Sequence, residues 1–162
     1  MSKFRLATIA ALALIPAAAS AQVLQERNLP LSIAQEIAEG AVEACAAKNF
    51  SVTATVVDRA GLVRAVLLTD KAGPHTIEAS RAKAYTAASA RNNTTAIMEN
   101  AEKNPAARHL ASIEGFLLLG GGVPVKVGDE VIGAVGVGGA PGGHLDEECA
   151  NAGIEKAKAK LR

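Results

Sequence analysis

Two pairs of β-rich runs, each joined by a short turn, constrain the fold of this chain most. Residues 51–57 alternate hydroxyl and apolar side chains and connect through Asp58-Arg59-Ala60-Gly61 to the run 62–68. Residues 123–127 connect through 128–130 to the apolar run 131–137. Runs separated by turns this short pair as antiparallel hairpins. We therefore expect an α+β fold around an antiparallel sheet, and not a doubly wound parallel fold.

Helical segments surround these hairpins. Residues 31–48 place Ile33, Ile37, Ala41 and Cys45 at four-residue spacing, which gives one apolar stripe. Pro74 opens an alanine-rich helix that runs to Ala90, at a position where its missing N–H costs nothing. Further helices are predicted over 94–102 and 145–161, and a short apolar strand over 116–119.

The amino terminus has the layout of a secretory signal peptide. Lys3 and Arg5 precede an uncharged apolar stretch, and Ala19-Ser20-Ala21 offers small residues for cleavage. The stretch is shorter than the roughly 20 residues that a membrane-spanning helix needs. We expect residues 1–21 to be removed and the protein to be periplasmic or secreted. No repeat or linker interrupts residues 22–162, which are expected to form one domain without a transmembrane segment.

Composition bears on two functional questions. The formal net charge is +1, and the sequence has no Trp, three Phe and one Tyr, so neither charge nor stacking residues favour nucleic-acid binding. Cys45 and Cys149 are the two cysteines. An exported chain can keep a disulfide between them, but each also lies on a predicted helix, where a free thiol packs as a small apolar group.

Sequence motifs for catalysis are weak. The glycines between 133 and 139 do not follow the dinucleotide or phosphate-loop patterns, and no nucleophile elbow is present. His75 and Glu78 lie three residues apart on one helix and can face one site. His144 precedes three acidic residues, which either contribute to a metal site or favour the helix dipole in a first turn.

The helix over 74–91 carries the most unusual charge pattern. Arg81, Lys83, Tyr85 and Arg91 stand among many alanines. Two interpretations are open. These side chains form either an ordinary solvated face or an anion-binding rim that takes carboxylates beside an apolar pocket.

Six motifs occur in order along the chain, at residues 56–61, 72–76, 83–87, 120–125, 133–139 and 146–150. Their order resembles the GlcG/HbpS family of haem-binding and haem-degrading-type domains. The similarity covers nearly all of residues 31–160. It implies a profilin-like fold, with α/β/α layers around a five-stranded antiparallel sheet, and homo-oligomers that are often tetramers or octamers. It also implies a sensor or transport partner for secreted members, whereas other relatives are associated with glycolate or propanediol metabolism.

The resemblance also implies a haem site. Thr94 stands at the family's iron-binding threonine, while Ala90 and Asn93 replace the usual aromatic residue and proline. We expect haem to be the ligand, with Thr94 as the axial residue in an exposed turn and His75 as the alternative. Arg81, Lys83 and Arg91 would hold the propionates, and Tyr85 would line the pocket. Two other hypotheses are an enzyme or accessory protein for a small organic acid, without iron, and a purely structural oligomer.

Overall fold

The computed structural model describes residues 23–162 and has four helices, four strands and two 3-10 segments in this range. The predicted signal peptide, residues 1–21, lies outside it. None of the described helices is long and apolar enough to span a membrane. In chain order the elements are α1 (Leu31–Ala46), β1 (Thr53–Asp58), β2 (Val63–Leu68), α2 (His75–Ala90), α3 (Thr94–Lys103), η1 (Pro105–Ser112), β3 (Gly122–Val127), β4 (Glu130–Gly138), α4 (Gly143–Ala157) and η2 (Lys158–Lys160).

The strands form one antiparallel sheet in the order β2-β1-β4-β3. Both predicted hairpins are confirmed, and β1 pairs with β4 to join them. The expected fifth strand is wrong, because residues 116–119 pair with no strand. Side chains of α2 hold this segment instead. The Leu117 N–H donates to Thr86 Oγ1 at 2.9 Å, and the Phe116 ring meets Tyr85 edge-on at 6.1 Å.

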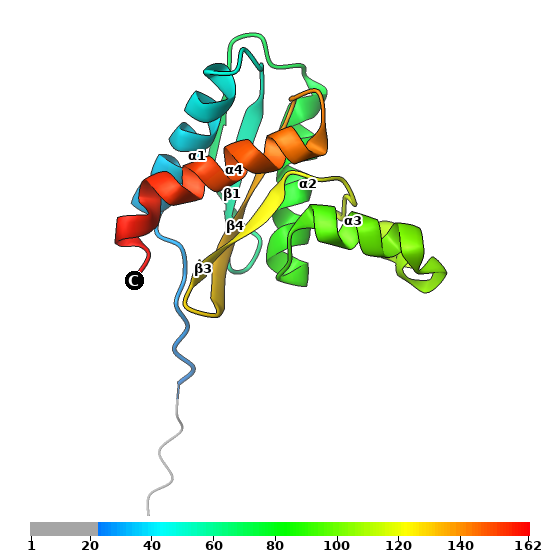
Figure 1. Cartoon of the computed structure of the whole chain (residues 1–162). Coiled ribbons are helices and arrows are strands. Elements are labelled where there is room, and N and C mark those ends of the chain that lie inside the picture. Colours follow the sequence, from blue (N-terminus) through cyan, green and yellow to red (C-terminus); the bar gives the residue numbers. More distant parts are fainter. Residues whose placement is uncertain (1–22) are drawn as a thin grey trace, which may run out of the picture.

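Helices α1 and α4 cover one face of the sheet (Figure 1). Most of the apolar core lies between these helices and the sheet, and includes Ile37, Val56 and Val135. The two helices approach closely because glycines face each other. A Cβ on Gly40 would lie 3.0 Å from the Gly153 Cα. Cys45 and Cys149 form a disulfide between α1 and α4, which decides between the two alternatives that the sequence left open.

Helix α2 covers the opposite face of the sheet, and α3 with η1 extends outward beside it (Figure 1). The interface under α2 is partly polar. The Thr53 and Thr76 hydroxyl oxygens lie 2.7 Å apart, as do those of Thr55 and Ser80. Close approach needs a glycine in β4, since a Cβ on Gly136 would lie 2.1 Å from the Ser80 carbonyl oxygen.

Candidate functional site

The two candidate axial residues lie at opposite ends of α2. His75 is its first residue and Thr94 follows its end. A helix of 16 residues is about 24 Å long at 1.5 Å per residue. One iron cannot be bound by both side chains, so they are alternatives and not partners.

Thr94 is buried at the start of α3, and the expectation that the turn exposes its hydroxyl is wrong. The residue has no exposed surface, and its Oγ1 accepts a hydrogen bond of 2.8 Å from the Gly122 N–H in β3. The hydroxyl therefore connects the start of α3 to the sheet. A ligand can reach Thr94 Oγ1 only when the start of α3 moves.

Lys83 is also buried, and it is not part of a surface rim. Its Nζ donates to Asp146 Oδ2 at 2.8 Å and to the Val137 carbonyl oxygen at 2.9 Å. Asp146 Oδ1 accepts from the Ala140 N–H. Burial raises the pKa of the Asp146 carboxyl, and its contact with Lys83 opposes that shift. The expected propionate role of Lys83 is incompatible with this arrangement, because its ammonium is already bound.

The remaining predicted cations are at the surface of α2. Arg81 Nε donates to Glu78 Oε2 at 2.9 Å, and 43% of the Arg81 side chain is exposed. Arg91 ends the helix in the left-handed conformation, with φ 55°, and is exposed. Arg81 and Arg91 are therefore available to an anion, although Arg81 already has a carboxylate neighbour.

Tyr85 lies between α2 and two neighbouring turns. Its ring packs over Gly61 and Gly115, where added Cβ atoms would lie 2.7 and 3.3 Å from it. A small pocket of about 100 Å³ beside Tyr85 is also lined by Arg59 and Ser89. The pocket is smaller than the roughly 300 Å³ at which sites for drug-sized ligands begin. It is too small to hold haem.

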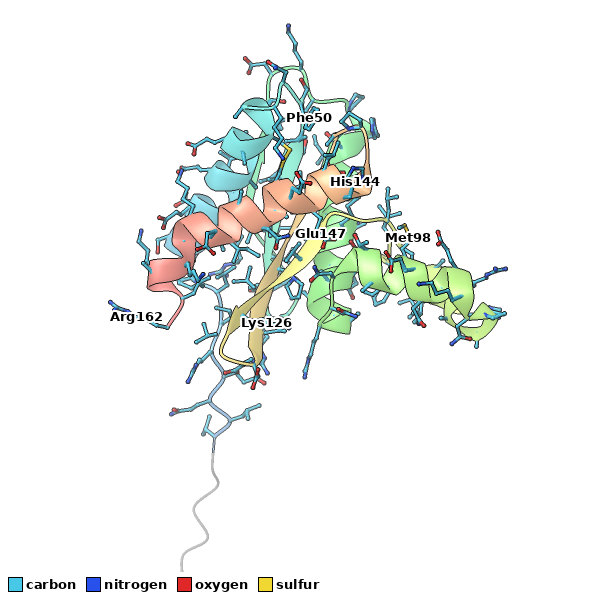
Figure 2. The ribbon with its side chains drawn as sticks, in the orientation of Figure 1. Phe50, Met98, Lys126, His144, Glu147 and Arg162 are labelled. Carbon is cyan, nitrogen blue, oxygen red and sulfur yellow. A yellow bond between two sulfur atoms is a disulfide. The ribbon has the colours of Figure 1, made fainter. Side chains whose placement is uncertain are left out.

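An apolar groove of about 520 Å³ lies between α3 and η1 and was missed in the sequence. Met98 of α3 and Leu118 provide apolar lining, and Arg108 of η1 provides a cation. Met98 is labelled in Figure 2. Arg108 Nε donates to the Ala101 carbonyl oxygen at 3.2 Å, which holds its side chain along the groove. Little in the sequence indicates this groove, because η1 was not predicted and Met98 looks like an ordinary apolar residue of a helix.

The first turn of α4 connects three other helices, which the sequence also did not reveal. Glu147 accepts a hydrogen bond of 2.7 Å from Asn93 Nδ2 and a short one from Thr95 Oγ1. These two residues flank Thr94, and Glu147 lies near the start of α3 in Figure 2. Four consecutive residues of α4 make such contacts. Asp146 binds Lys83 of α2, and Glu147 binds the start of α3. Glu148 binds Lys48 after α1, and Cys149 is bonded to Cys45 of α1.

The metal alternatives gain no support from the geometry. Among residues 23–162, no three His, Cys, Asp or Glu side chains are grouped as a metal site requires. Glu78 is paired with Arg81, and the acidic residues after His144 are bound to the partners given above. The three acids of that first turn therefore have structural contacts of their own.

The described residues define an α+β fold with an antiparallel sheet between helical layers and a projecting helical segment. The model of the family described as haem degrading protein HbpS-like matches residues 29–155, and the chain belongs to this family. The family resemblance of the sequence is thereby confirmed.

Solved structures agree with this assignment. The chain is 37% identical to HbpS, with a TM-score of 0.79, over 86% of this chain and 96% of that one. It is 27% identical to the protein ORFY of Klebsiella pneumoniae, with a TM-score of 0.80, over 86% and 97%. A PduOC:heme complex shares the fold at 20% identity, with a TM-score of 0.71, over 80% and 94%. No curated protein matches the chain.

Proposed function

We propose that this protein binds haem, as an accessory in haem scavenging or sensing. The observation that carries the proposal is the apolar groove between α3 and η1 in a chain of the HbpS-like family. Its volume of about 520 Å³ lies within the roughly 300–1,000 Å³ of small-molecule sites. A haem site needs an apolar slot, an axial donor and cations for the propionates.

The residues around the groove match these needs. Met98 offers a thioether, a known axial donor to haem iron, and Arg108 offers a guanidinium for a propionate. Thr94 stays the axial candidate that the resemblance implies, on the same helix as Met98. Arg91, just before α3, is a second propionate candidate. When bound, haem would supply the iron chemistry, while these residues would orient it and exclude water.

The proposal includes where the protein works and with what. The amino-terminal pattern supports export to the periplasm or beyond. We further propose that the mature chain forms homo-oligomers, tetramers or octamers in the terms of the family resemblance, and meets a sensor or transport partner there. Mass spectrometry of the protein from its host should find a chain that begins near Gln22. A chain that keeps residues 1–21 would contradict export.

A haem titration of the mature protein tests the ligand. Binding should produce a Soret band that saturates with added haem. Thr94→Ala should shift the band if Oγ1 binds iron, and Met98→Leu should shift it if the thioether does. His75→Ala is the third axial test, at the far end of α2. Removing a propionate partner through Arg91→Ala or Arg108→Ala should weaken affinity several-fold and leave the band position unchanged.

Arg81→Ala separates two locations of the site. Arg81 lies on the middle of α2, away from the groove, so we expect unchanged affinity if the groove holds haem. A several-fold loss in Arg81→Ala, with none in Arg108→Ala, would place the propionates along α2 instead. If added haem gives no Soret band, haem binding is overturned. If the protein then binds a small carboxylate saturably, the organic-acid alternative is favoured.

A further inference from the structure

The two edges of the sheet differ in how they are protected. At the β3 edge, Pro124 lacks an N–H and Lys126 is exposed, and both features discourage pairing with another strand. Between Ala65 and Leu68 the β2 edge has neither proline nor charge. Five of the ten large exposed apolar side chains of the described residues lie along β2 or beside it: Leu62, Val63, Val66, Leu68 and Ile77.

Backbone pairing determines which β2 residues face outward. The Thr69 N–H donates to the Val52 carbonyl oxygen at 3.0 Å, so Thr69 is bonded toward β1. Backbone groups alternate in direction along a strand, and Leu67 is therefore also bonded toward β1. Val66 and Leu68 present their N–H and carbonyl groups to the free edge. Their side chains, 41% and 50% exposed, lie on the sheet face that α2 covers only in part.

We propose that β2 pairs antiparallel with β2 of a second copy of this chain, around a two-fold axis at Leu67. Val66 then lies opposite Leu68 of the second copy, and each pair makes two backbone hydrogen bonds. Arg64 is 39% exposed, and its Nη1 lies 3.6 Å from Asp58 Oδ2 of its own chain. In this register the exposed part of Arg64 lies opposite the exposed Asp70 of the second copy, so the guanidinium can contact both carboxylates. The apolar centre and the two opposite charges make the strand complementary to itself.

The neighbouring registers lack this match. Because outward-facing residues must pair with each other, the axis can move only by whole residues, to Val66 or to Leu68. An axis at Val66 sets Arg64 opposite Leu68, and an axis at Leu68 sets Val66 opposite Asp70. Both put a charge against an exposed apolar side chain, whereas the axis at Leu67 leaves none of these mismatches.

Helix α2 extends the same contact. Thr76 is bonded to Thr53, which pairs with Leu68, and Ile77 therefore lies next to this end of β2. Ile77 is 40% exposed. A two-fold axis perpendicular to the sheet brings both α2 helices to the same face, so Ile77 of each copy covers the joined strands. The contact specifies one interface of the homo-oligomer in the proposed function and does not depend on haem.

Sedimentation velocity on the mature protein tests the interface. We expect wild type to be oligomeric, and Val66→Lys or Leu68→Lys to reduce the mass to a smaller multiple of the chain. Leu119→Lys is the matched control, because Leu119 is 44% exposed and shortly precedes β3, the edge strand opposite β2, so it should leave the mass unchanged. A monomeric wild type would overturn the proposal, as would unchanged mass in both β2 variants. The Soret titration is scored separately, so a failure here leaves haem binding untouched.

Single-cysteine variants in β2 report the register of the proposed pairing. In the proposed pairing, residue 67 is the β2 residue that lies opposite the same residue of the second copy. Leu67→Cys should therefore give a disulfide-linked dimer under mild oxidation. Val66→Cys reports an axis at 66, and Leu68→Cys an axis at 68. The native thiols do not interfere, because Cys45 and Cys149 are bonded and buried. Efficient cross-linking at 66 or 68 in place of 67 would overturn the register.

Discussion

Lys83 and Asp146 form an ion pair 2.8 Å long whose side chains are 2% and 4% exposed. The two residues are 63 positions apart, and their contact joins α2 to the first turn of α4 across the sheet. The pair lies beside Gly121, where an added Cβ would be 2.6 Å from the Asp146 Cβ and 3.1 Å from Lys83 Nζ. It therefore fixes the helices of opposite layers to each other.

Breaking the pair on one side should destabilise the fold strongly. Lys83→Met leaves the Asp146 carboxylate buried without its cation, which costs about 3–5 kcal/mol. The double variant Lys83→Met/Asp146→Asn keeps an acceptor for the Ala140 N–H and removes the lone charge, so it should lose less. Urea denaturation measures both. An equal or larger loss in the double variant would contradict the ion-pair explanation.

The same carboxyl should give a pH-dependent contribution to stability. Burial raises the pKa of Asp146 above its ordinary 3.8, so the folded state binds this proton more tightly than the unfolded state does. The contribution of this group to stability is complete below pH 3.8, the ordinary pKa of the carboxyl, and is lost as pH rises through the folded-state pKa. Unfolding free energies of wild type and Asp146→Asn, measured from acid to neutral pH, should show a difference that falls in this window. A difference that grows with pH would mean that Lys83 dominates.

Close packing of α2 on β4 should make Gly136 intolerant of any side chain. The Cβ of Gly136→Ala would lie 2.1 Å from the Ser80 carbonyl oxygen, and we expect a loss of about 1–3 kcal/mol. Gly138→Ala, two residues along the same strand, meets nothing nearer than 3.6 Å and is the matched control. Thermal melts of both variants compare them. Equal melting temperatures would show that α2 shifts without cost.

The disulfide should contribute measurably to stability. It closes a loop across a sequence separation of 104, and removing such a bond typically costs about 2–5 kcal/mol. In urea denaturation, the unfolding free energy of Cys45→Ala/Cys149→Ala should be lower than that of wild type by this amount. Both sulfurs are buried, so a reductant should act on the native protein only after partial unfolding. Rapid reduction of native wild type would show that α1 and α4 separate readily.

Glu147 should control the order of the start of α3. Glu147→Gln replaces one of the two accepting oxygens with an NH2 group, so the side chain can no longer accept from both Asn93 and Thr95. Amides at the start of α3 should then exchange hydrogen faster. Glu148→Gln is the matched control, because its carboxylate pairs with Lys48 at the surface. It should leave exchange in α3 unchanged. Equal exchange in both variants would contradict a positioning role for Glu147.

The elements of the fold were predictable because their signals are local. Alternation and short turns predicted both hairpins, and four-residue spacing predicted α1. The strand over 116–119 was wrong because an apolar run does not say what it packs against. Phe116 and Leu117 meet side chains of α2, and no neighbouring strand is available to pair with them.

The candidate site was harder to predict because it depends on long-range contacts. Lys83 was taken for a surface cation, although it continues the spacing of Thr76 and Ser80 on the helix face that meets the sheet. Its partner Asp146 looked like an ordinary first-turn acid. Nothing local to either residue indicates the other, so a buried pair cannot be separated from two surface charges by pattern alone.

The four bonded residues at 146–149 also affect the order of assembly. They lie near the carboxyl end, yet their partners are on α1, α2 and at the start of α3. A nascent chain that ends before residue 143 has made the sheet and all three partner helices, but it lacks these four contacts between them. These contacts therefore form only when synthesis is almost complete, and truncation before residue 143 should loosen α1, α2 and α3 together and not one helix alone.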